Sequence, residues 1–131
     1  MSYYYLFLDD ARKRSDVTWV NLPFVSWEIV RNYSQFVTTI EKFGIPKFVT
    51  FDHDLAEAHY NQMMYDVNPE KYNKLYSTFK EKTGFDCSKW LVKYCSVHNL
   101  PFPDYTVHSM NPIGKMNIIS YIESYKKSIK L

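Results

Sequence analysis

The sequence predicts an α/β fold of three layers, in which a mainly parallel sheet is flanked by helices. Short apolar runs that suit strands alternate with longer segments whose apolar residues recur at helical spacing. The first run, YYYLFL at residues 3–8, is too continuous for a strand with one solvated face and is typical of a strand buried on both sides. Strands that alternate with helices are joined by right-handed crossovers, so we expect the strands to run in one direction.

Four segments have the composition of strands. The first ends abruptly at an acidic pair, Asp9 and Asp10. The third, KFVTF, is β-branched and aromatic and lies between Pro46 and a polar stretch. The predicted strands span residues 3–8, 26–31, 47–51 and 105–109.

Four other segments have the periodicity of helices. Gly44 and Pro46 follow the first of them and are typical of a helix end. Asn68 followed by Pro69 is typical of a helix start, and Asp86 is a candidate cap for the next helix. The predicted helices span residues 33–43, 68–84, 86–98 and 113–129.

The composition is that of one folded domain. The chain has 131 residues, of which 46% are hydrophobic and 18% aromatic, far too many for a disordered protein. We therefore expect a single domain over residues 1–131, with an insert or lid at about 55–84. The 16 basic and 14 acidic residues give a net charge of only +2, so we expect no extended nucleic-acid surface.

The cysteines and the N-terminal residues favour a cytoplasmic protein. Cys87 and Cys95 are eight residues apart on one predicted helix, roughly 12 Å, which is too far for a disulfide. The N-terminal segment has neither the basic leader nor the cleavage site of a signal peptide, and no apolar run is long enough to span a membrane. We expect reduced thiols, a cytoplasmic location and no membrane partner.

Unusual polar residues lie at the ends of three of the predicted strands. In parallel sheets the carboxyl ends of the strands meet at one edge, where ligands bind. The sequence therefore predicts one polar site built from residues far apart in the chain. Its members are Asp9 and Asp10 at the end of the first strand, Asp52, His53 and Asp54 at the end of the third, and His108, Ser109 and Asn111 at the end of the fourth.

The carboxylates of this edge predict a site for a divalent metal. Clustered carboxylates repel each other unless a cation neutralises them, and oxygen ligands suit Mg²⁺ or Mn²⁺. We expect Asp9, Asp10 and Asp52 to hold the metal. If the strand stays extended beyond Asp52, then Asp54 faces the same side and His53 the opposite side.

The remaining residues of the edge predict a site for a phosphate. His108 can carry a proton near neutral pH, and the Ser109 hydroxyl can bond a phosphoryl oxygen. Asn111 precedes a helix start, where free N–H groups favour an anion. Arg12 directly follows the acidic pair and can reach the same phosphate.

Each of these residues also has a structural interpretation. An Asp after a strand is commonly a turn or cap residue, and any one of the four taken alone is more easily explained in that way. The occurrence of polar residues at three strand ends weakens the structural interpretation. His53 alone fits both interpretations equally well.

Four motifs resemble those of a known family. They are LFLDDAR at 6–12, FDHDL at 51–55, TGFD at 83–86 followed by KWL, and VHSMNPIG at 107–114. In this order they resemble the landmarks of the cyclic-phosphate-processing receiver-like family, which is related to the receiver domains of two-component signalling. The resemblance implies a shortened receiver-like, flavodoxin-like fold and a role in processing cyclic phosphates.

The resemblance also implies roles for individual residues. Asp9 and Asp10 match the acidic pair after the first strand of a receiver, Asp52 matches the phosphoryl-accepting Asp, and Ser109 matches the hydroxyl residue after the fourth strand. A receiver carries in addition a Lys after a fifth strand. This chain passes from Ser109 directly into its last helix, which disfavours phosphorelay signalling.

Together these observations predict a metal-dependent phosphohydrolase or phosphodiesterase acting on a cyclic or terminal phosphate of a nucleotide or RNA end. Two alternatives stay open: a non-catalytic module that sequesters a cyclic nucleotide, and a stand-alone receiver. The sequence does not predict the oligomeric state. The predicted catalytic residues are His108, Asp54 and His53, the predicted substrate-binding residues Ser109, Asn111 and Arg12, and the predicted metal ligands Asp9, Asp10 and Asp52.

Overall fold

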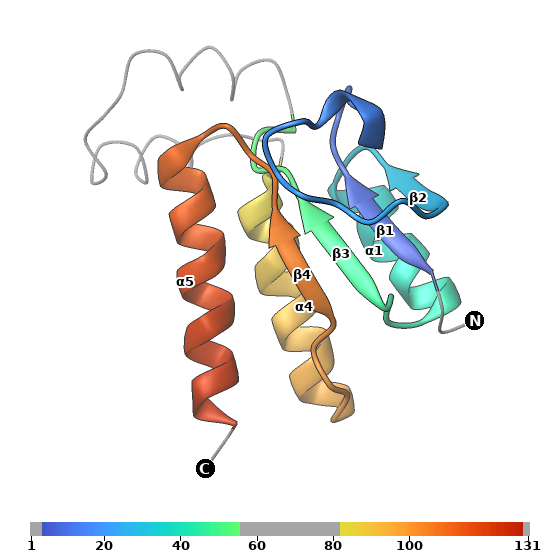
Figure 1. Ribbon diagram of the computed structural model, residues 1–131. Helices are drawn as coiled ribbons and strands as arrows, with labels where there is room; N and C mark the ends of the chain where they lie inside the picture. The colour runs from blue at the N-terminus through green and yellow to red at the C-terminus, as the bar shows by residue number, and fades with distance from the viewer. Residues whose placement is uncertain (1–3, 56–81, 130–131) are drawn as a thin grey trace.

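The computed structural model describes residues 4–55 and 82–129. Four parallel strands form one sheet in the order β2-β1-β3-β4 (Figure 1). The parallel α/β fold predicted from the sequence, a shortened receiver-like fold, is thus confirmed. The strands are β1 (Tyr5–Leu8), β2 (Trp27–Val30), β3 (Phe48–Phe51) and β4 (Asp104–Val107).

Three α-helices are described, together with one short 3-10 helix. They are α1 (Tyr33–Phe43), α4 (Gly84–His98), α5 (Pro112–Ser128) and η1 (Arg14–Asp16). Helix α4 lies between α1 and α5 and packs against both (Figure 1). The predicted helix at 68–84 and most of the predicted insert or lid at 55–84 lie outside the described residues.

Helix α4 begins earlier than the sequence predicts. Its cap is Thr83 rather than Asp86: the Thr83 hydroxyl accepts a hydrogen bond from the N–H of Asp86, and the Asp86 carboxylate accepts one from the N–H of Thr83. This reciprocal pair satisfies two N–H groups of the first turn. The prediction that Asp86 is the cap was therefore wrong, because Asp86 is the third residue of the helix.

The three helices cover one face of the sheet and bury the main core. Leu6 and Leu8 of β1 lie on this face together with Val49 and Phe51 of β3. The core continues into the helices through Phe36, Ile40, Cys87, Leu91, Cys95, Ile118 and Ile122, all with no exposed surface. Both cysteines are buried and free, as predicted.

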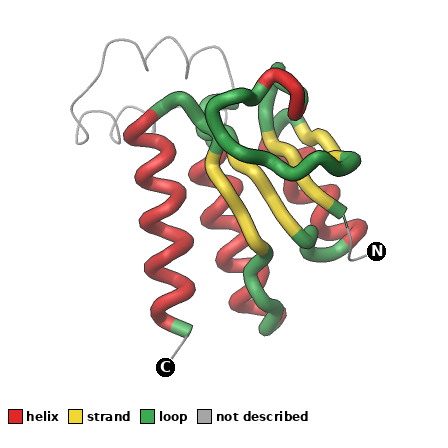
Figure 2. The backbone as a smooth tube through the Cα atoms, in the orientation of Figure 1, coloured by secondary structure: helices red, strands yellow, loops and turns green. Residues whose placement is uncertain are grey.

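The opposite face of the sheet is covered by the chain between β1 and β2. Phe7, whose neighbours Leu6 and Leu8 face the helices, packs here against Val17 and Leu22. Figure 2 shows this segment, drawn as loop with one short helix, running across the strands. The third layer therefore consists mainly of irregular chain, and this segment encloses the site described next.

The register of the strands aligns three strand ends. Leu8 pairs with Phe51, and Phe51 pairs with Val107. The residues that follow these three positions are therefore neighbours at the carboxyl edge of the sheet. Within the described residues, no helix is long and apolar enough to cross a membrane.

Candidate metal and phosphate site

Asp9, Asp52 and His108 form a buried cluster at the carboxyl edge of the sheet. Asp9 and His108 have no exposed surface, and Asp52 is 1% exposed. One ligand atom from each residue lies within 4.8 Å of the other two. Two buried carboxylates this close together need a cation, so this group can bind a metal ion.

Hydrogen bonds hold Asp9 as a carboxylate. Its Oδ1 accepts from the N–H groups of Ala11 at 2.9 Å and Arg12 at 2.8 Å, and its Oδ2 lies 3.0 Å from Nε2 of His108. Burial alone would raise the pKa of Asp9. The hydrogen bonds from His108 and from the two N–H groups outweigh burial and lower this pKa to about 2.

Contacts at both ring nitrogens and a stacked aromatic ring hold the imidazole of His108. Its Nδ1 shares a 2.8 Å hydrogen bond with Oγ1 of Thr50, and the Phe7 ring stacks on it at 4.8 Å between centroids. Because Asp9 is ionised, Nε2 carries the hydrogen of the Asp9 bond, and a neutral ring accepts from Thr50 at Nδ1. If Nε2 instead binds a metal, Nδ1 carries the hydrogen and donates it to Thr50.

Arg12 supplies a cation to the cluster. Its Nη1 lies 3.5 Å from Oδ2 of Asp9 and 3.9 Å from Oδ2 of Asp52. The Arg12 side chain is 28% exposed, so its guanidinium lies between the buried carboxylates and solvent. Arg31 fixes the main chain here by donating from Nη1 to the carbonyl oxygens of Asp9 at 3.1 Å and Arg12 at 2.6 Å.

Asp52 lies in a turn that is closed by tight packing. Its Oδ1 accepts a hydrogen bond from the N–H of His53 at 2.9 Å, and the carbonyl of His53 accepts one from the N–H of Gly84 at 2.8 Å. A Cβ added to Gly84 would overlap the carbonyl oxygen of Asp52. Only glycine therefore lets α4 begin this close to the acidic turn.

Asp54 belongs to a second buried group beside the first. Strand β3 ends at Phe51, so the condition for Asp54 and Asp52 to share one side is not met. The Asp54 carboxylate instead bonds Nδ1 of His53 at 3.0 Å and accepts from Nδ2 of Asn111 at 3.2 Å. This second group ties the end of β3 to the start of α5.

The other predicted residues occupy different positions around the two groups. Ser109 is buried next to His108, and its Oγ accepts from the N–H of Asn111 at 3.1 Å. Asn111 caps α5 and accepts from the N–H of Gly114. Asp10 is half-buried and is not part of the Asp9, Asp52 and His108 group among the described residues. Its predicted role as a metal ligand stays a prediction.

Three residues that support the site were not predicted from the sequence. Thr50 holds the His108 ring, Trp19 donates its indole N–H to the carbonyl oxygen of His108 at 2.8 Å, and Arg31 holds the loop after Asp9. For Thr50 a signal existed, because it precedes Asp52 by two residues in an otherwise apolar strand. For Arg31 a signal also existed, because it directly follows β2, whose last residue Val30 pairs with Leu8. For Trp19 no local pattern pointed to the site.

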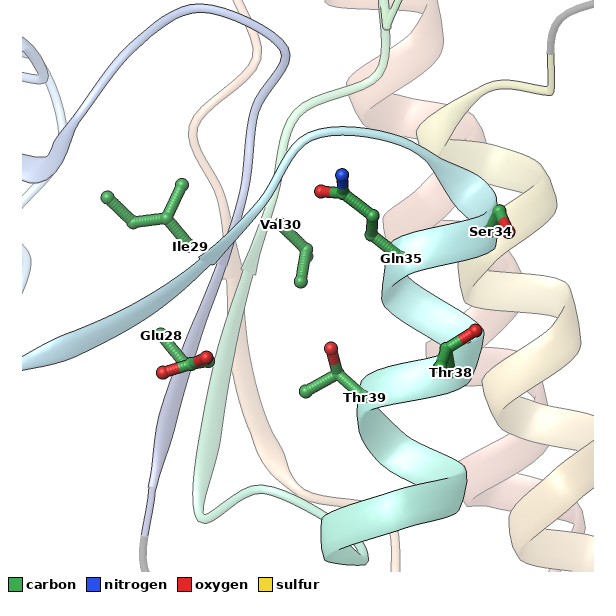
Figure 3. A pocket seen from close by; sticks show the side chains of 7 residues that line it. All are labelled: Glu28, Ile29, Val30, Ser34, Gln35, Thr38 and Thr39. Atoms are coloured by element: carbon green, nitrogen blue, oxygen red, sulfur yellow. The ribbon is translucent and has the colours of Figure 1, made fainter.

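A separate hollow lies beside the edge strand β2, between β2 and α1. Figure 3 shows its lining, in which Gln35 and Thr39 of α1 face the edge strand. Its volume is about 300 Å³, and no predicted site residue lines it. The lining residues are Glu28, Ile29, Val30, Ser34, Gln35, Thr38 and Thr39.

A parallel sheet whose first and third strands end in buried carboxylates, with no fifth strand described, defines a shortened receiver-like α/β domain. The family model for the cyclic-phosphate processing receiver domain matches residues 4–124, and the chain belongs to this family. No curated protein and no solved structure matches the chain. The resemblance inferred from the sequence motifs is thus confirmed, and the family links this chain to cyclic-phosphate processing.

Proposed function

We propose that this protein is a metal-dependent phosphoesterase acting on a cyclic or terminal phosphate of a nucleotide or RNA end. The observation that carries the proposal is the buried group of Asp9, Asp52 and His108 with Arg12 beside it. It combines two carboxylates, an imidazole and a guanidinium at one edge of the sheet. The link of the family to cyclic-phosphate processing supports the proposal.

Asp9 and Asp52 suit a hard divalent cation. Both supply carboxylate oxygens, both are buried, and Asp9 is ionised at neutral pH. Mg²⁺ or Mn²⁺ held there would polarise the phosphoryl group and offset the charge that develops on it. Arg12 now supplies the positive charge at this position, and we expect it to turn from the carboxylates to a phosphoryl oxygen of the substrate.

His108 is proposed as the proton donor. Water attacks phosphorus, the bond from phosphorus to a ribose oxygen breaks, and the leaving oxygen takes the Nε2 proton of a His108 imidazolium, which leaves a neutral ring with its hydrogen on Nδ1. The proton that the attacking water releases restores the imidazolium. Thr50 keeps the ring in place through Nδ1, and Ser109 and Asn111 are the predicted phosphate-binding residues beside it. The contacts of Asp54 with His53 and Asn111 support a positioning role for this carboxylate.

Phosphorus NMR tests the proposal directly. The protein is incubated with nucleoside 2′,3′-cyclic phosphates, 3′,5′-cyclic nucleotides, cyclic dinucleotides and 3′-phosphorylated RNA, with Mg²⁺, with Mn²⁺ or with a chelator. We expect one class to give a new phosphate resonance only when metal is present. Binding without product under every metal would refute the enzyme and favour a module that sequesters the nucleotide.

Two variants of His108 and one control complete this test. His108→Ala and the more conservative His108→Gln should both abolish turnover while the fold, checked by circular dichroism, is retained. His98→Ala is the matched control, because His98 is an exposed residue in the last turn of α4. Full activity in either His108 variant would show that the proton donor is a different group.

A further inference from the structure

We infer that Trp19 and Met110 form a subsite for the base of a nucleotide, next to the position of its phosphate. The inference rests on the proposed function and deepens it by assigning the residues that would contact the base of the nucleotide substrate. Both side chains are exposed, Trp19 by 38% and Met110 by 56%, although both are large and apolar. Both also lie against Arg12.

The Trp19 ring is fixed to the strand end that carries His108. Its indole N–H donates to the carbonyl oxygen of His108 at 2.8 Å, across 89 residues of the chain. This hydrogen bond uses the one polar group of the side chain and leaves the ring itself exposed in part. A rigid, partly exposed aromatic ring beside an anion site is a platform for stacking a base.

Arg12 lies between the Trp19 ring and the acidic cluster where the phosphate is proposed to bind. The guanidinium carbon lies 5.2 Å from the centre of the Trp19 ring, and Nη1 of the same group lies 3.5 Å from Asp9. One guanidinium therefore separates the aromatic ring from the acidic cluster. A nucleotide has the same order of groups, because a ribose separates its flat base from its phosphate.

Met110 supplies a second apolar surface at the same place. Its sulfur lies 3.8 Å from Nη2 of Arg12, and thioether side chains adapt to flat rings of different shape. Neither Met110 nor the occupied indole N–H of Trp19 offers a hydrogen bond that would distinguish one base from another. We therefore expect the subsite to accept all four bases with similar affinity.

The same segment contains a matched control pair. Arg14 lies over the ring of Phe24, with its guanidinium carbon 3.8 Å from the ring centre, and Phe24 is 89% exposed. Arg14 bonds the carbonyl oxygen of Leu22 rather than a carboxylate. Like the first pair, this second pair combines an arginine with an exposed aromatic ring. Unlike the first pair, it makes no contact with the acidic cluster among the described residues.

Calorimetric titration in the presence of Mn²⁺ tests the subsite without requiring turnover. The ligands are cytidine 3′-monophosphate and glycerol 2-phosphate, which carry the same phosphate group with and without a base. Stacking of one base contributes about 1–3 kcal/mol, so we expect the wild type to bind the nucleotide roughly 5- to 150-fold more tightly. Trp19→Ala should remove this preference, Trp19→Phe should retain most of it, and Phe24→Ala should leave it unchanged.

Four results would overturn the inference. Equal affinity of the wild type for both ligands, or an equal loss for both in Trp19→Ala, would refute the base subsite alone. Failure of both ligands to bind would refute the proposed phosphate site as well. A trinucleotide with a 3′-phosphate should show the same loss in Trp19→Ala as the mononucleotide, and a loss confined to the trinucleotide would show that the terminal base does not lie on Trp19.

Discussion

Nε2 of His108 lies 3.0 Å from Oδ2 of Asp9, although the two residues are 99 positions apart in the chain. The contact exists because β1 and β4 both pair with β3, in a register that ends all three strands at the same level. The short sheet thus brings the imidazole of His108 and the carboxylate of Asp9 into contact.

Removal of the two buried carboxylates should abolish metal binding. In the wild type, Mg²⁺ or Mn²⁺ should raise the melting temperature, because a ligand that binds only the folded state stabilises it. Asp9→Asn combined with Asp52→Asn should eliminate this shift, as measured by thermal denaturation with and without metal. Asp104→Asn, an exposed acid at the start of β4, is the control. Persistence of the shift in the double variant would place the metal elsewhere.

Thr50→Val should impair turnover more than stability. Valine keeps the shape of threonine but leaves Nδ1 of His108 without its hydroxyl partner. Loss of such a supporting hydrogen bond commonly lowers activity or metal affinity by roughly 10- to 100-fold. Thr106→Val, in the register position next to Thr50 on β4, is the matched control. Steady-state rates for the two variants should differ by at least tenfold, and equal rates would assign Thr50 a structural role only.

The carboxylate of Asp9 should make stability depend on pH in the acid range. The pKa of Asp9 is lowered to about 2 in the folded state, because the hydrogen bonds from His108, Ala11 and Arg12 outweigh the effect of burial. A lowered pKa contributes stability that is present above the unfolded value, about 3.9, and is lost as the pH falls towards 2. The difference in unfolding free energy between wild type and Asp9→Asn should shrink over this window. A constant difference from pH 6 to pH 2 would contradict the assignment.

Arg12→Gln should destabilise the metal-free protein and increase its response to metal. The guanidinium lies 3.5 and 3.9 Å from two buried carboxylates, and its loss should cost roughly 1–3 kcal/mol of unfolding free energy. Since metal and Arg12 compete for the same charge, the metal-induced rise in melting temperature should exceed that of the wild type. Arg14→Gln is the control and should leave the metal response unchanged. A smaller rise in Arg12→Gln would show that Arg12 assists metal binding rather than competing with it.

Much of the fold and the central cluster could be predicted from the sequence. Asp9, Asp52 and His108 each follow a strand directly, so one rule about parallel sheets was enough to bring them together. The position of Asp54 could not be predicted, because it depends on where β3 stops being extended. Arg31 follows β2 directly and could have been found by the same rule. Trp19 lies in the segment between β1 and β2, and only the tertiary structure shows that this segment covers the site.

The glycine at the start of α4 has a consequence for how the stability of this domain depends on its length. The hydrogen bond from the N–H of Gly84 to the carbonyl of His53 joins the points where the chain leaves the site and where it returns. Closing a loop becomes only slightly more costly as the loop grows, by about 0.6 kcal/mol for each doubling of its length. A change in the number of residues between these two points should therefore cost little stability as long as this hydrogen bond keeps Asp52 in its place.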